Sequence, residues 1–191
     1  MSRFLKNIWP SFFLLFAAML GNQTTALALE NETLLMALPA GFNPKPGFTT
    51  RQGAMEMAEY VPIGETVENW SRMITVQIVH GKPKMGTDDF GKNMDKTWVS
   101  GCPGADNKKI TNASESGYPV SIWFYGCPLS PKAKKPENTF MKFIEGNDSF
   151  YILQVAYHRE VTMEDVPVAM EFLKKIRVCD TRLPDRPCTV R

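Results

Sequence analysis

The sequence lacks the short motifs that mark the common catalytic and cofactor-binding sites. It has no G-x-S-x-G elbow, no H-E-x-x-H, no G-x-G-x-x-G and no phosphate-binding P-loop. It also has only two histidines in 191 residues, so acid–base and metal chemistry have few candidate side chains. The sequence therefore predicts no cofactor and no metal site.

An excess of charge of either sign is absent as well. The chain has 22 basic and 20 acidic side chains, for a formal net charge of +2. Without a strong positive field, nothing favours a nucleic-acid partner. Glycine (13) and proline (14) are ordinary for this length, and 43% of the residues are hydrophobic. This composition excludes a collagen-like fibre and a disordered chain, and it indicates one globular domain.

Only one long apolar run occurs, and it lies near the N-terminus. The run from Ile8 to Leu20 is too short for a bilayer core of ~30 Å, which takes about 20 apolar residues. It follows a short basic start and precedes Ala26–Ala28, the small-x-small pattern that a signal peptidase cleaves. We therefore expect a bacterial Sec-type signal peptide at 1–28, cleaved after Ala28. The mature chain, 29–191, is then periplasmic or secreted and not stably inserted in a membrane; an uncleaved N-terminal anchor is the alternative.

The four cysteines all lie in the expected mature chain, at Cys102, Cys127, Cys179 and Cys188. An even number in an exported protein favours two disulfides, with three connectivities open. The short spacing favours Cys179–Cys188, which leaves Cys102–Cys127. A four-cysteine metal site and a catalytic cysteine are disfavoured, because there is no C-x₂-C pair and no cysteine stands beside a histidine.

Alternating hydrophobic patterns predict a series of strands separated by turn residues. Apolar and polar residues alternate in two early segments and in two expected hairpins. The early strands are expected at 55–61 and 70–80, and the hairpins at 110–114 with 118–127 and at 140–145 with 150–157. Glycine, asparagine, aspartate and serine occupy the turns between the hairpin strands.

Two segments instead have the period of an amphipathic helix. In the segment near 88–98, Thr87 is expected to be the N-cap, and the apolar stripe is Phe90, Met94 and Trp98. The second helix is expected near 166–178, starting at Asp165 or Val166, because Pro167 fits only a first turn. Its apolar stripe consists of Ala169, Phe172, Leu173 and Ile176. Together with the strands, these helices predict an α+β single domain, a twisted and mainly antiparallel sheet covered by two or more helices.

Four segments also suggest a family resemblance. The Leu-Pro-Ala-Gly-Phe segment at 38–42, with the strand order and the closing helix, resembles the PsbP-type α-β-α sandwich. The segments at 60–65 and 68–70 and the tail at 178–186 resemble an uncharacterised family of exported proteobacterial proteins. The resemblance implies an exported location and an approximate fold, and it implies no active-site residue.

The hypothesis that the protein is an enzyme depends on its two histidines. His80 and His158 each end an expected strand, and beside Glu160 they would form a weak acid–base or metal site if the two strand ends were adjacent. Surface positions at strand ends are the simpler interpretation. A small hydrolase or transferase with a site near His80 or His158 is therefore the alternative function.

The favoured function is an exported, non-enzymatic module that binds a protein partner or a component of the cell envelope. Trp70 and Arg72 are the candidate partner-binding residues, since tryptophan and arginine are enriched at interface hot spots. With both helices expected on one face of the sheet, the other face would be open to a partner. Packing of Trp70 in the core, with Arg72 merely solvated, is the competing interpretation. The oligomeric state is left open.

Overall fold

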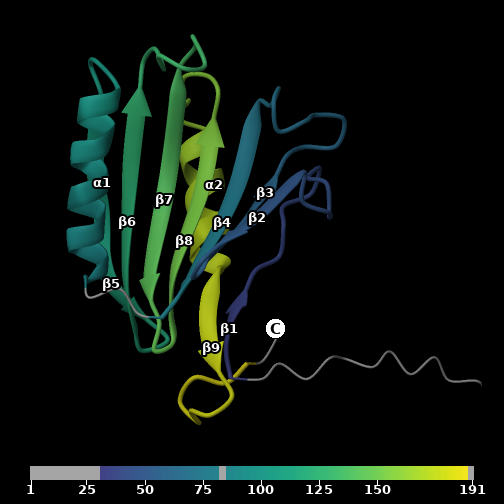
Figure 1. The fold of residues 1–191 in the computed structure, drawn as a ribbon, viewed down its shortest axis with the longest axis vertical. Helices are drawn as coiled ribbons and strands as arrows, with labels where there is room; N and C mark the ends of the chain where they lie inside the picture. The colour runs from purple at the N-terminus through teal and green to yellow at the C-terminus, as the bar shows by residue number, and fades with distance from the viewer. Residues whose placement is uncertain (1–30, 82–84, 189–191) are drawn as a thin grey trace, which may run out of the picture.

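The computed structural model describes residues 31–81 and 85–188 (Figure 1). The predicted signal peptide at 1–28 and its cleavage after Ala28 lie outside the described residues and stay predictions. Within the described part, no helix is both long and apolar enough to cross a membrane. In chain order the elements are β1 (Glu32–Leu35), β2 (Phe48–Gln52), β3 (Met55–Tyr60), β4 (Arg72–His80), α1 (Thr87–Gly101), β5 (Asp106–Glu115), β6 (Tyr118–Cys127), β7 (Glu137–Glu145), β8 (Ser149–Tyr157), α2 (Asp165–Lys175) and β9 (Arg177–Asp180).

Seven of these strands form one antiparallel sheet in the order β2-β3-β4-β8-β7-β6-β5. The two predicted hairpins are present, and they join β5 to β6 and β7 to β8. Strand β4 pairs with β8 over its whole length, which brings together residues 69 to 85 positions apart. Strands β1 and β9 pair separately as a two-stranded ribbon. The predicted α+β single domain with a mainly antiparallel sheet is confirmed.

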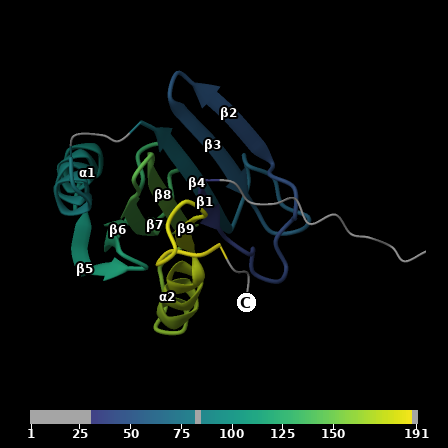
Figure 2. The ribbon, with the colours of Figure 1, turned by 90° about the horizontal axis from the view of Figure 1, so that it is seen from below.

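The two helices pack on opposite faces of this sheet, which gives three layers (Figure 2). On one face the predicted stripe of Phe90, Met94 and Trp98 packs against a cluster that includes Phe143 and Trp123. On the other face α2 packs its own stripe against a second, larger cluster. The expectation that both helices cover one face is therefore wrong. Its physical reason is that β6, β7 and β8 are buried on both faces, so alternation along them does not show which face a helix covers.

The ends of both helices differ from the sequence-based expectation. Gly86, not Thr87, is the N-cap of α1, and Thr87 is a buried residue of its first turn. Helix α2 begins at Asp165 as predicted but ends at Lys175 rather than at residue 178. The chain turns into extended conformation at Ile176 because Arg177–Asp180 pairs with β1 as β9.

Both predicted disulfides are present. Cys102–Cys127 joins the end of α1 to the end of β6, with its Cα atoms 5.8 Å apart. Cys179–Cys188 closes the tail after β9, with a Cα separation of 5.0 Å. By the chain-entropy model, the longer loop contributes about 3.5 kcal/mol and the shorter one about 2.7 kcal/mol to stability. Two disulfides fit a protein of an oxidising compartment.

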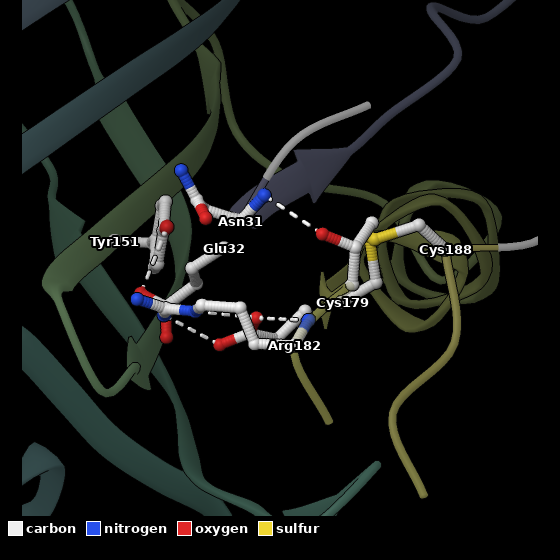
Figure 3. Close-up of a disulfide and its surroundings, with 8 residues drawn as sticks. Asn31, Glu32, Tyr151, Cys179, Arg182 and Cys188 are labelled. Atoms are coloured by element: carbon white, nitrogen blue, oxygen red, sulfur yellow. Dashed lines mark hydrogen bonds and ion pairs between the residues drawn. A yellow bond between two sulfur atoms is a disulfide. The ribbon is translucent and has the colours of Figure 1, made fainter. Parts of the chain in front are cut away.

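Glu32 fastens β1 to the sheet beside the second disulfide (Figure 3). Its carboxylate accepts hydrogen bonds from the backbone N–H groups of residues 147–149, in the β7–β8 turn, and from the hydroxyl of Tyr151 at 3.1 Å. Nearby, Arg182 donates to both carboxylate oxygens of the buried Asp180, which lowers the pKa of Asp180 to about 2. The N-terminal strand, the tail and the sheet are thus held together at one end of the molecule.

Candidate functional site

Strands β2, β3 and β4 extend beyond both helices as a wing of the sheet (Figure 2). On the α2 side of this wing lies an open groove of about 520 Å³ whose walls include Met36, Tyr60 and Ile78. On the α1 side lies a cleft of about 560 Å³, a volume within the usual range for ligand sites. We call it the β4–β8 cleft; it is lined by Glu59, Val67, Glu68, Trp70, Met73, Thr75, Lys132, Ala133, Glu137, Gln154, Ala156 and His158.

The floor of the β4–β8 cleft comes from two paired strands. Met73 lies opposite Ala156, and Thr75 lies opposite Gln154, so these four side chains share one face of the sheet. The loop at 61–70 forms one rim, and the loop at 128–136 forms another. Helix α1 packs on β5, β6 and β7 and leaves this part of the face uncovered. The cleft is therefore a consequence of where α1 stops covering the sheet.

Trp70 and His158 form the aromatic part of the cleft. Their rings stack with centroids 3.4 Å apart and an interplanar angle of 19°. The backbone N–H of His158 donates to the carbonyl of Ser71 at 3.1 Å, which fixes the stack to the start of β4. Burial, and then the positive charge of Lys135, lower the pKa of His158, so its ring is neutral at pH 7. Its buried Nδ1 has no hydrogen-bond partner among the described residues.

Carboxylates outnumber cations along the walls of the cleft. Glu59, Glu68 and Glu137 come from β3, the 61–70 loop and β7, whereas Lys132 is the only cation in the lining. Burial raises the pKa of Glu59, and the charge of Lys132 opposes that shift. None of the three carboxylates forms an ion pair with another described residue. The cleft thus has negative charge that the protein itself does not neutralise by contact.

The structure separates the two residues that the sequence suggested as one binding patch. Trp70 packs beside Met73 and Val67 on the α1 side of the sheet. Arg72 belongs to the opposite face, where its guanidinium carbon lies 5.4 Å from the centroid of the Phe42 ring. Trp70 lines the β4–β8 cleft and Arg72 does not.

The two histidines are also far apart. His80 pairs with Ser149 at one end of the β4–β8 ladder, whereas Arg72 and Tyr157 form the other end, next to His158. At about 3.3 Å per residue, the ends are roughly 26 Å apart along the strands. A single site of His80, His158 and Glu160 is therefore excluded by the antiparallel pairing.

His80 instead lies between two side chains of neighbouring strands, an arrangement that sequence reasoning missed. Its Nδ1 is 3.4 Å from the hydroxyl of Ser149, and its Nε2 is 3.3 Å from Glu56. Ser149, His80 and Glu56 thus form a row with the residue types of a serine hydrolase, but Ser149 is only 6% exposed. The backbone N–H groups beside it, at 147–149, already donate to Glu32 and are not free to stabilise an oxyanion. The geometry therefore disfavours nucleophilic catalysis at this row.

No family model and no curated protein matches the chain. Solved structures with a similar arrangement include the Saccharomyces cerevisiae Ran-binding protein Mog1p, with 13% identity and a TM-score of 0.46 over 81% of this chain and 98% of that one. A protein of unknown function from Pseudomonas aeruginosa, PA94, described as a putative regulator, has 13% identity and a TM-score of 0.43 over 76% and 92%. LpqN of Mycobacterium tuberculosis, described as involved in cell envelope biogenesis, has 8% identity and a TM-score of 0.41 over 78% and 84%.

Proposed function

We propose that this protein is an exported, non-enzymatic module that binds a protein partner or an envelope component through the β4–β8 cleft. The observation that carries the proposal is the uncovered sheet face beside α1, which forms a cleft with an aromatic wall and unneutralised carboxylates. Clefts that combine apolar surface with a few polar groups are the usual form of a binding site.

The geometry beside His80 and the separation of the two histidines favour binding over hydrolysis or group transfer. The backbone N–H groups next to Ser149 already donate to Glu32, and His158 lies at the other end of the β4–β8 ladder, stacked on Trp70. Within 31–81 and 85–188, no group of three or more histidine, cysteine or carboxylate side chains is arranged to hold a metal ion. Non-enzymatic binding is the function that this geometry supports best.

Export is tested by the mass of the mature protein. We expect the protein recovered from the periplasm or the medium of an expressing bacterium to begin at Leu29, because a signal peptidase cleaves after Ala28. Intact-mass spectrometry under non-reducing conditions should also show the loss of four hydrogens that two disulfides require. A mass that retains Met1 would contradict the predicted cleavage.

Binding in the cleft is tested by photocrosslinking in cells. With a benzoylphenylalanine in place of the exposed Glu68, on the rim, we expect a discrete adduct. The same group in place of Val168, exposed on α2 on the other face, should give none. Trp70→Ala should abolish the Glu68 adduct, and Arg72→Ala should retain it, because only Trp70 lines the cleft.

Thermal denaturation of each variant separates lost binding from lost folding. Because Trp70 is half-buried, Ala133→Trp provides a second variant that fills the cleft from a surface loop. An adduct that survives both substitutions in folded protein would contradict binding at this cleft. Adducts of equal yield from the crosslinkers at positions 68 and 168 would also contradict binding at this cleft.

A further inference from the structure

The chemistry of the β4–β8 cleft also indicates what kind of side chain it receives. We infer, on the basis of the proposed function, that an extended segment of a partner protein places a basic side chain, arginine before lysine, beside Trp70 among the carboxylates of Glu59, Glu68 and Glu137. The occupant is thus a cationic protein segment.

The first argument is charge complementarity. Three carboxylates from three separate elements line one cleft, and Lys132 is the only cation among its lining residues. His158 is mainly neutral at pH 7, because burial and the charge of Lys135, which lies outside the lining, lower its pKa more than the charge of Glu137 raises it. A guanidinium that enters the cleft would find carboxylate acceptors that have no ion pair with another described residue.

The second argument is the aromatic wall. His158 covers one face of the Trp70 ring and, with packing near Met73, holds it in place, so the part of Trp70 that lines the cleft is a pre-ordered surface rather than a mobile one. Guanidinium groups bind to the faces of tryptophan rings and donate to carboxylates in the same plane, which an ammonium group does less well. The combination of tryptophan and carboxylates therefore favours arginine over lysine.

The third argument concerns Lys132, which is exposed on the 128–136 loop and acts on Glu59 through its charge. It is the internal competitor of an incoming cation. Its removal should therefore strengthen the binding of a basic ligand, whereas it should weaken the binding of an acidic one. This opposite sign separates the inference from a general contribution of Lys132 to folding.

The experiment uses the mature protein with both disulfides intact and the pentapeptide acetyl-Gly-Gly-Arg-Gly-Gly-amide. Citrulline, a neutral isostere of arginine, replaces it in the control peptide, and a glutamate peptide reports the opposite charge. Titrations follow the indole N–H signal of Trp70 by NMR, assigned with Trp70→Phe, while the signals of Trp98 and Trp123 serve as internal references.

We expect the arginine peptide to shift the Trp70 signal with a dissociation constant about tenfold lower than that of the citrulline peptide. Glu59→Gln with Glu137→Gln should remove that difference, and Lys132→Ala should lower the dissociation constant for the arginine peptide by a factor of about 2–5. Glu164→Gln, an exposed carboxylate at the start of α2 on the other face, should leave it unchanged. Raising the ionic strength to about 1 M, where the Debye length is roughly 3 Å, should weaken binding of the arginine peptide alone.

Equal binding of the arginine and citrulline peptides, or preference for the glutamate peptide, would overturn the inference. So would weaker arginine binding in folded Lys132→Ala. These results leave the proposed function intact if the Glu68 crosslink still depends on Trp70. Loss of that dependence in the crosslinking experiment instead contradicts the proposed function itself.

Discussion

Lys142→Met is expected to destabilise the protein by about 3–5 kcal/mol, the range measured when one partner of a buried charged network is removed. Lys142 lies in the middle of β7, and its side chain is 0% exposed. Its ammonium group donates to the carboxylate of Glu115 and to the carbonyls of Leu173 and Ile176, the latter two at 2.9 Å and 2.8 Å. One lysine thus joins β7 to the end of β5 and to the last turn of α2.

The large effect follows from what the substitution leaves behind. Methionine fills much of the same volume but donates no hydrogen bond, so two carbonyls at the end of α2 lose their buried donor. Glu115 is less affected, since its side chain is 30% exposed and can be hydrated. Burial lowers the pKa of Lys142, and the hydrogen bond to Glu115 together with its charge offsets that shift only in part.

Guanidinium denaturation at neutral pH measures the loss, with linear extrapolation to water. Lys109→Met is the matched control, because Lys109 pairs with Asp88 at 2.9 Å on the surface, with 41% of its side chain exposed. Exposed pairs of this kind contribute about 0–1 kcal/mol. Comparable losses from the two substitutions would show that Lys142 does not act as a buried connection.

Both helices, strands β3 to β8 and the disulfides could be predicted from the sequence because most of their signals are local, whereas β1, β2 and β9 were not predicted. The stripe of Phe90, Met94 and Trp98 repeats with the helical period, and these residues pack together against the sheet. The two hairpins are marked by turn residues between alternating segments. The pairing of Cys179 with Cys188 followed from their short spacing in the chain.

The cleft could not be predicted, because it depends on a pairing between distant segments. Trp70 and His158 become neighbours only when β4 pairs with β8, and Glu137 joins them only when β7 pairs on the other side of β8. Trp70 was suggested by its residue type, but Arg72 was grouped with it only because the two are near in sequence. Alternation along β4 places Arg72 on the face opposite Met73, whereas Trp70 precedes the strand and packs on the same side as Met73.

Lys142 is a charged residue in an otherwise apolar strand pattern, and the sequence alone does not show which groups it contacts. A lysine between Phe140 and Ile144 on one face of a strand is unusual for a face that is otherwise apolar. Alternation along β7 places Lys142 between two apolar residues, but only the position of the end of α2 supplies the carbonyls that accept hydrogen bonds from the buried ammonium group. Which groups contact a buried charge therefore depends on the tertiary structure and not on the local sequence.

Gly91→Ala is expected to destabilise the protein by about 2–3 kcal/mol, although alanine favours a helix over glycine by about 1 kcal/mol. Gly91 lies on the buried side of α1, where a Cβ atom would come within 2.2 Å of Nε1 and 2.3 Å of Cε2 of Trp123. The indole cannot easily move aside, because Nε1 donates to the Ser121 hydroxyl at 3.2 Å, and that hydroxyl donates to the Thr87 carbonyl at 3.0 Å. Moving α1 away would also break the bond from the Tyr125 hydroxyl to the Gly91 carbonyl, at 2.9 Å.

Gly101→Ala is the matched control in the same helix. Apart from its chain neighbours and the backbone of its own helix, no heavy atom lies within 4 Å of a Cβ at that position, so only the change in helix propensity acts, and stability should rise by up to about 1 kcal/mol. The two substitutions are chemically identical, and they should shift the thermal midpoint in opposite directions. The sign of the Gly91→Ala shift decides between the two effects: a downward shift means that α1 contacts the sheet at van der Waals distance along Gly91. An upward shift like that of Gly101→Ala would mean that α1 and Trp123 have room to separate, and the close packing of this layer would be refuted.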